Sequence, residues 1–141
     1  MKKIPYGESH YPSLIQQGYV YVDKTPYIQL LEEYQAKYLF FLRPRRFGKT
    51  LFLSTLEYYY DHKNKDVFLE FFGETSIGKT PTSLKNQYYI LRFNFSGITT
   101  STKEVLLESF TQKVIESLEK FLEKYHLAVE YDTSGLPATI D

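Results

Sequence analysis

Residues 38–51 read Tyr38-Leu39-Phe40-Phe41-Leu42-Arg43-Pro44-Arg45-Arg46-Phe47-Gly48-Lys49-Thr50-Leu51, and this stretch decides the predicted fold. The apolar run at 38–42 has no alternation, which is typical of a strand in a parallel sheet with helices on both faces. A basic turn at 43–48 follows, and the segment 49–60 then carries apolar residues at helical spacing. This succession predicts an α/β fold.

The flanking sequence extends this pattern in both directions. Thr25 followed by Pro26 predicts a helix start, and Ser101 with Glu104 forms a capping box. In chain order the predicted elements are strand 19–22, a helix from Thr25-Pro26 to about Gln35, strand 38–42, helix 49–60, a short helix at 67–72, strand 88–95 and a long helix from Thr102 to about Tyr125. We therefore expect a three-layer α/β/α arrangement with parallel strands and a right-handed crossover.

Composition bounds the class of protein. The 141 residues include 17 Lys+Arg and 17 Asp+Glu, no Cys, and 18% aromatic residues. A balanced net charge gives no global argument for nucleic acid, so any basic site must be local. No apolar stretch approaches the ~20 residues of a membrane helix, and the N-terminal residues lack the apolar core of a signal peptide. We expect one cytoplasmic domain without membrane contact.

Two segments compete as a nucleotide phosphate loop. A literal search for Gly, four residues, Gly, Lys and Ser or Thr finds Gly73-Glu74-Thr75-Ser76-Ile77-Gly78-Lys79-Thr80. Such a loop needs a buried strand before it and a helix directly after it, because the helix N-terminus supplies free N–H donors. Here Pro81 follows, without an N–H, and no helical period comes next. We expect this match to be a decoy.

The segment 43–50 lacks the first glycine but has both predicted neighbours. Gly48 permits close backbone approach, Lys49 can reach terminal phosphates, and the Thr50 hydroxyl can ligate Mg²⁺. Arginines can replace some missing backbone donors by bidentate contacts. The predicted nucleotide and phosphate contacts are Arg43, Arg45, Arg46, Phe47, Gly48, Lys49, Thr50 and Leu51. The alternative from chemistry alone is a solvated basic turn.

These residues carry a family resemblance. Tyr21-Val22-Asp23-Lys24-Thr25, then 41–51, then Leu56-Glu57-Tyr58-Tyr59 resemble the AAA-ATPase-like domain family of bacterial and archaeal proteins, from about Pro5 to about Gly97. The resemblance implies a P-loop NTPase that binds ATP and Mg²⁺, and many members carry a PD-(D/E)XK nuclease-like domain further along the chain. The family's own loop has Arg-Pro-Arg-Arg-Phe-Gly-Lys, so the absent glycine is a family trait.

The resemblance also implies a third strand that ends in adjacent Asp and Glu, for Mg²⁺ and the attacking water. No predicted strand ends that way, and the strand at 88–95 runs into Asn94-Phe95-Ser96. We therefore expect residues 1–141 to be the N-terminal part of a larger domain, with a weakly structured tail at 126–141. Such a chain contains no catalytic residue, binds ATP weakly and hydrolyses little of it. We also expect an uncovered sheet edge open to self-association.

Other interpretations stay open at this stage. The basic loop beside exposed aromatic residues fits a nucleic-acid-binding module without nucleotide chemistry. Asp23 and Lys24 precede a predicted helix, where Asp23 can favour the positive end of the helix dipole, and the family resemblance alternatively implies a role in shaping the nucleotide pocket.

Overall fold

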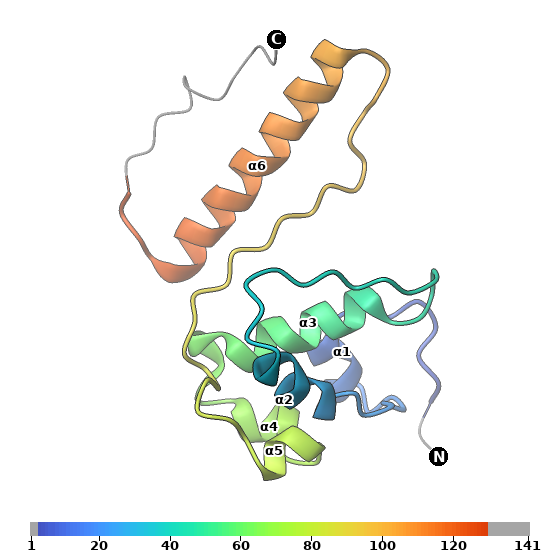
Figure 1. Ribbon diagram of the computed structural model, residues 1–141, viewed down its shortest axis with the longest axis vertical. Coiled ribbons are helices and arrows are strands. Elements are labelled where there is room, and N and C mark those ends of the chain that lie inside the picture. Colours follow the sequence, from blue (N-terminus) through green and yellow to red (C-terminus); the bar gives the residue numbers. More distant parts are fainter. Residues whose placement is uncertain (1–2, 130–141) are drawn as a thin grey trace. The chain divides into compact units, whose positions relative to one another are not determined.

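The computed structural model describes residues 3–129, and the chain divides into two units, Met1–Tyr89 and Ile90–Asp141. The described helices are α1 (Tyr11–Gln16), α2 (Pro26–Glu33), α3 (Lys49–Tyr60), the 3₁₀ helix η1 (His62–Asn64), α4 (Phe68–Phe72), α5 (Ser76–Lys79) and α6 (Lys103–Tyr125) (Figure 1). The first unit contains α1 to α5 with η1, and the second contains α6.

The first unit is built around an aromatic core beside α3. The buried apolar residues of this core are Tyr11, Ile28, Phe52, Tyr59, Phe68, Phe71, Phe72 and Ile77. Tyr59 of α3 contacts Phe68 and Phe72 of α4 through their rings, at centroid distances of 5.9 and 5.6 Å. Aromatic side chains bury ~150–250 Å² each, so a few of them supply most of a small core. Part of the high aromatic content of this chain is thereby used in packing, while other Tyr and Phe side chains remain exposed.

The predicted helices form close to their expected bounds. The helix α3 covers 49–60 as predicted, α2 begins at Pro26, and α4 lies within the predicted short helix. The cap of α6 differs by one residue, because Thr102 rather than Ser101 accepts a hydrogen bond from the backbone N–H of Val105. The apolar stripes of these helices are local in sequence, and Thr102 caps α6 with its side chain, whereas Thr25 makes no side-chain cap bond to α2.

The predicted α/β fold is wrong for the part of the chain that the structure describes, which contains helices and no strand. The segments 19–22, 38–42 and 88–95 are extended without forming a ladder. Within residues 3–129, the backbone N–H groups of Tyr19 and Val20 donate to the carbonyls of Leu14 and Lys3, and a single parallel bridge joins Asp61 and Tyr88. A strand requires a hydrogen-bonded neighbour, and an apolar run does not specify one.

The run at 38–42 shows how an apolar segment stays extended without a sheet. Tyr38, Phe40 and Leu42 are 84–90% exposed. Phe41 points the other way and packs edge-on against Phe52 of α3, with ring centroids 5.4 Å apart. Because no sheet forms within residues 3–129, these residues offer no sheet edge, and the expected self-association through such an edge is wrong.

The second unit is described for residues 90–129. The extended residues 90–95 run back along α6, where the Ile90 N–H donates to the Tyr125 hydroxyl at 2.7 Å. Nearer the start of α6, the ring of Phe95 stacks on Phe110 at 5.1 Å. The helix ends at Tyr125, and the residue at its C-cap, His126, has a φ of +54°. Most of the predicted tail at 126–141 lies outside the described residues.

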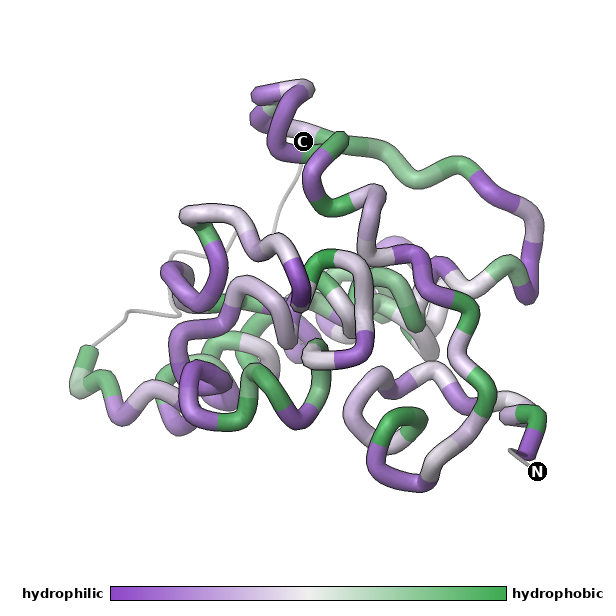
Figure 2. The backbone as a smooth tube through the Cα atoms, turned by 90° about the horizontal axis from the view of Figure 1, so that it is seen from below, coloured by the Kyte–Doolittle hydropathy of each residue, from purple (hydrophilic) through white to green (hydrophobic). Residues whose placement is uncertain are grey.

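Hydropathy along the backbone changes over short distances. In Figure 2 hydrophobic stretches are interrupted repeatedly by hydrophilic residues. Within residues 3–129, no helix is both long enough and apolar enough to cross a membrane.

Candidate functional site

The segment 43–50 comprises a turn at 43–48 and the first two residues of α3, Lys49 and Thr50; we refer to it as the loop. Gly48 is the N-cap of this helix with a φ of +75°, a left-handed conformation that glycine adopts at little cost. Its carbonyl accepts the first helical bond, from the N–H of Phe52 at 2.9 Å. The N–H groups of the first turn have no helical acceptor, and together with the helix dipole they favour an anion at this position. The glycine therefore places a donor-rich helix start at the end of the basic loop.

The predicted site residues surround this helix start. Lys49 is half-buried, and its ammonium donates to the carbonyl oxygens of Arg43 and Pro44, the latter at 3.0 Å. Leu51 is half-buried and packs against the aromatic core. The remaining predicted contacts that the structure leaves exposed are Arg43, Arg45, Arg46, Phe47 and Thr50. The loop folds around its own lysine, and its arginines extend towards solvent.

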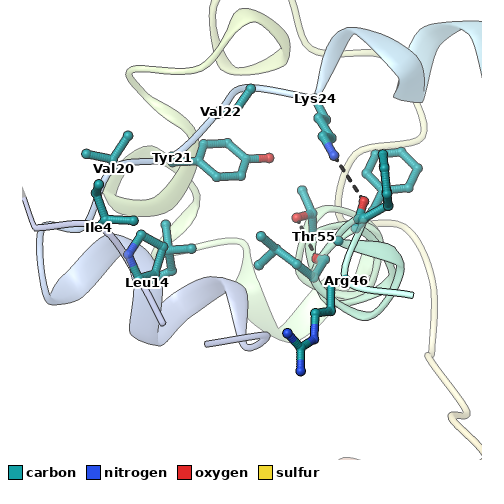
Figure 3. A pocket seen from close by; sticks show the side chains of 13 residues that line it. Ile4, Leu14, Val20, Tyr21, Val22, Lys24, Arg46 and Thr55 are labelled. Atoms are coloured by element: carbon teal, nitrogen blue, oxygen red, sulfur yellow. Dashed lines mark hydrogen bonds between the residues drawn. The ribbon is translucent and has the colours of Figure 1, made fainter. Parts of the chain in front are cut away.

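A cavity of about 430 Å³ lies beside the loop, between the N-terminal segment and α3 (Figure 3). This volume falls within the ~300–1,000 Å³ of typical small-molecule sites. The lining is largely apolar and consists of Ile4, Pro5, Leu14, Val20, Tyr21, Val22, Lys24, Arg46, Phe47, Gly48, Leu51, Phe52 and Thr55. Burial raises the pKa of the Tyr21 phenol, whose hydroxyl is buried without a hydrogen-bond partner among the described residues. The phenol therefore stays neutral at physiological pH.

Lys24 is a cation that reaches the loop from outside it, in addition to Arg43, Arg45, Arg46 and Lys49, and it is not among the site residues predicted from the sequence. Its ammonium donates to the carbonyl of Phe47 at 3.3 Å, as Figure 3 shows. A Cβ on Gly48 would lie 3.4 Å from the same ammonium. The contact joins residues 23 positions apart, so local sequence patterns give no signal for it beyond the resemblance around 21–25.

Asp23 has a structural role that differs from simple complementarity to the dipole of α2. Its Oδ1 accepts the N–H and the hydroxyl of Thr25 at 2.8 and 2.7 Å, and its Oδ2 accepts the N–H of Ser76 at 2.8 Å. The hydroxyl of Thr25 in turn accepts the N–H of Ile77 at 3.1 Å. Asp23 and Thr25 thus connect the segment before α2 to the start of α5.

The literal match at 73–80 has neither of the neighbours that a phosphate loop needs. The helix α4 precedes it, and no helix follows Thr80 directly. Its backbone donors are engaged within the protein, since the N–H groups of Ser76 and Ile77 bind Asp23 and Thr25. A Cβ on Gly78 would approach the Phe72 carbonyl to 1.7 Å. The segment 73–80, which contains α5, is packed against the rest of the first unit and leaves no room for a phosphate; we refer to it as the packed turn.

Comparison with known proteins now identifies the family. The chain belongs to the family described as "Predicted AAA-ATPase", whose sequence model matches residues 5–139. The match extends beyond the resemblance seen up to about Gly97 and includes all of α6.

A relative from Azotobacter chroococcum mcd 1, described as "Uncharacterized protein in vnfD 5'region", is 50% identical over 58 residues. These residues make up 39% of this chain and 11% of the relative, so the chain spans a small part of that protein's length. No solved structure matches the chain.

Proposed function

We propose that the chain binds ATP, with the phosphates at the loop 43–50 and the nucleoside in the neighbouring cavity. The observation that carries the proposal is the position of this cavity, whose wall includes Arg46, Phe47 and Gly48 of the loop. An apolar cavity that opens onto a basic helix start suits a ligand with an aromatic base at one end and phosphates at the other. Membership in the predicted AAA-ATPase family supports the same ligand.

Each loop residue has a role in this proposal. The N–H groups of Gly48, Lys49, Thr50 and Leu51 would face the phosphate oxygens. Lys49 would exchange its contacts with the Arg43 and Pro44 carbonyls for the terminal phosphates. The arginines of the loop, Arg43, Arg45 and Arg46, would add bidentate contacts. Phosphate binding thus replaces the internal partners of Lys49 with a charged one.

We expect Mg²⁺ to bind at this site together with ATP and not in its absence. Residues 3–129 contain no group of three His, Cys, Asp or Glu side chains placed to hold a metal ion. Mg²⁺ commonly binds through phosphate oxygens, waters and one or two protein oxygens. The exposed hydroxyl of Thr50 at the start of α3 is the protein oxygen that we assign to it. The ion would neutralise part of the phosphate charge.

Thermal unfolding tests the proposal directly. A ligand that binds only the folded chain stabilises it by RT ln(1 + [L]/Kd). Mg²⁺-ATP should therefore raise the melting temperature of the chain, while adenosine at the same concentration should raise it less. Equal melting temperatures with and without saturating Mg²⁺-ATP would contradict the proposal. A phosphate-release assay on the same samples tests the expectation that this chain alone hydrolyses little ATP.

The loop also supports a second candidate function, binding of single-stranded nucleic acid. Tyr38 and Phe40 are 84% and 90% exposed and lie within five residues of Arg43, the first basic residue of the loop. Exposed aromatic rings beside arginines are a common platform for stacking bases and holding backbone phosphates. Competition separates the two functions: if single-stranded DNA binds and Mg²⁺-ATP neither displaces it nor shifts the melting temperature, the second candidate is correct.

A further inference from the structure

Lys24 stands between two residues that the fold holds in place. Asp23 and Thr25 bind each other through two hydrogen bonds and bind the N–H groups of Ser76 and Ile77 through two more. Thr25 is fully buried. The backbone on both sides of Lys24 is therefore anchored to α5, and the start of its side chain has a defined position.

The ammonium of Lys24 reaches the peptide that joins the loop to α3. It donates to the Phe47 carbonyl at 3.3 Å. It also lies close to Gly48, since a Cβ on this glycine would be 3.4 Å from the ammonium. An ammonium carries three donor hydrogens, and the hydrogen bonds of residues 3–129 engage one of those on Lys24. Two donors are available for a ligand at this position.

The charges that line the cavity favour an anion. Lys24 and Arg46 are the charged residues among the lining side chains, and no carboxylate is among them. Asp23, next in sequence to Lys24, directs both of its oxygens to Thr25 and Ser76. Asp23 keeps its negative charge, but within the described residues it forms no ion pair with Lys24.

We propose that Lys24 is a phosphate-contacting residue supplied from outside the loop, on the assumption that the chain binds ATP as proposed above. The loop and Lys24 then hold the phosphates from two separate segments of the chain. Asp23 and Thr25 act as positioning residues, because they fix the backbone from which Lys24 extends. In the absence of ligand, the bond to Phe47 keeps the ammonium at the site.

Three substitutions separate a phosphate contact from a mere support of the loop. Lys24→Gln keeps an N–H donor for the Phe47 carbonyl but removes the charge, Lys24→Met removes both, and Lys24→Arg keeps both. Lys65→Met, at an exposed lysine, is the matched control. Isothermal titration calorimetry of the full chain with Mg²⁺-ATP and with adenosine gives the dissociation constants, and circular dichroism confirms that each variant is folded.

The expected result is a loss of ATP affinity of about tenfold in Lys24→Met and Lys24→Gln, which corresponds to one charge-assisted hydrogen bond. Lys24→Arg should stay within about threefold of the original chain, and adenosine binding and Lys65→Met should be unaffected. The inference is overturned if Lys24→Gln binds ATP like the original chain, or if adenosine and ATP lose affinity equally. Absence of ATP binding by the unaltered chain would overturn the proposed function as well.

Discussion

Gly48-Lys49-Thr50 and Gly78-Lys79-Thr80 are the same three residues in two different surroundings. In the first, the glycine precedes α3, its φ is positive, and the first turn of a 12-residue helix follows. In the second, Gly78 and Lys79 lie inside the four-residue α5. This helix ends at Lys79, whereas α3 begins at the corresponding lysine, Lys49. A phosphate site depends on which backbone donors the fold leaves available, and the three-residue motif does not determine that.

The strongest way to test this difference is to add a methyl group to each glycine. Gly78→Ala would place a Cβ 1.7 Å from the Phe72 carbonyl, and backbone must move to accept it. We expect a loss of about 3 kcal/mol or more in the free energy of unfolding. Gly48→Ala meets the side chain of Lys24 at 3.4 Å and mainly suffers from its positive φ, at a cost of roughly 1–2 kcal/mol. Urea denaturation measures both values, and equal losses would contradict the packed-turn interpretation.

Removing the Asp23 carboxylate, which accepts a hydrogen bond from the segment 73–80, should have an intermediate effect on stability. Asp23→Ala deletes the acceptor for Ser76 and for two donors of Thr25, so we expect a loss of about 1–3 kcal/mol in stability. Asp23→Asn retains one oxygen acceptor and should lose less. Thermal denaturation of the two variants gives the comparison. An Asp23→Ala chain as stable as the original would mean that these bonds contribute nothing to holding the turn.

Alkaline pH should lower the free energy of unfolding by a smaller amount, because buried tyrosines of the first unit lose their protons. The Tyr11 hydroxyl donates to the Phe71 carbonyl in α4, and burial raises its pKa. Burial and the hydrogen bond to Glu32 likewise raise the pKa of Tyr60. The unfolded chain releases these protons near pH ~10 while the folded chain retains them, so stability should be constant below that pH and fall above it.

Urea denaturation between pH 8 and 11, followed by circular dichroism, measures this loss. Tyr60→Phe removes one of the phenols whose pKa is raised, the others being Tyr11 and Tyr21, and should make the decline with pH shallower. A stability that stays level above pH ~10 would show that these phenols titrate alike in the folded and unfolded chains.

The sequence predicted those features that depend on neighbouring residues. The bounds of α3 follow from its apolar spacing, and Pro26 marks the start of α2. The short helix α5 was missed although Thr75 caps it locally, since the acceptors of its first two N–H groups, Asp23 and Thr25, lie about 50 positions away. The sheet was predicted wrongly because an apolar run such as 38–42 reports its own hydrophobicity and not the presence of a pairing neighbour.

The candidate site likewise contains residues that local sequence indicated and residues that it did not. The loop residues were predicted from their order, as was the rejection of the segment 73–80. Lys24 and the apolar wall contributed by Ile4, Val20 and Val22 come from parts of the chain that precede Arg43, the first residue of the loop, by 19 to 39 positions. Their place at the cavity depends on how the N-terminal segment lies against α3, which no local pattern encodes.

The central claim is that the segment 43–50, and not 73–80, forms the ATP phosphate site. The most direct measurement is the dissociation constant for Mg²⁺-ATP in two matched variants, Lys49→Met and Lys79→Met. We predict that Lys49→Met weakens binding about 10- to 100-fold, since it removes a charged hydrogen-bond donor, and that Lys79→Met leaves it unchanged. Weakened binding in Lys79→Met with unchanged binding in Lys49→Met would contradict the account.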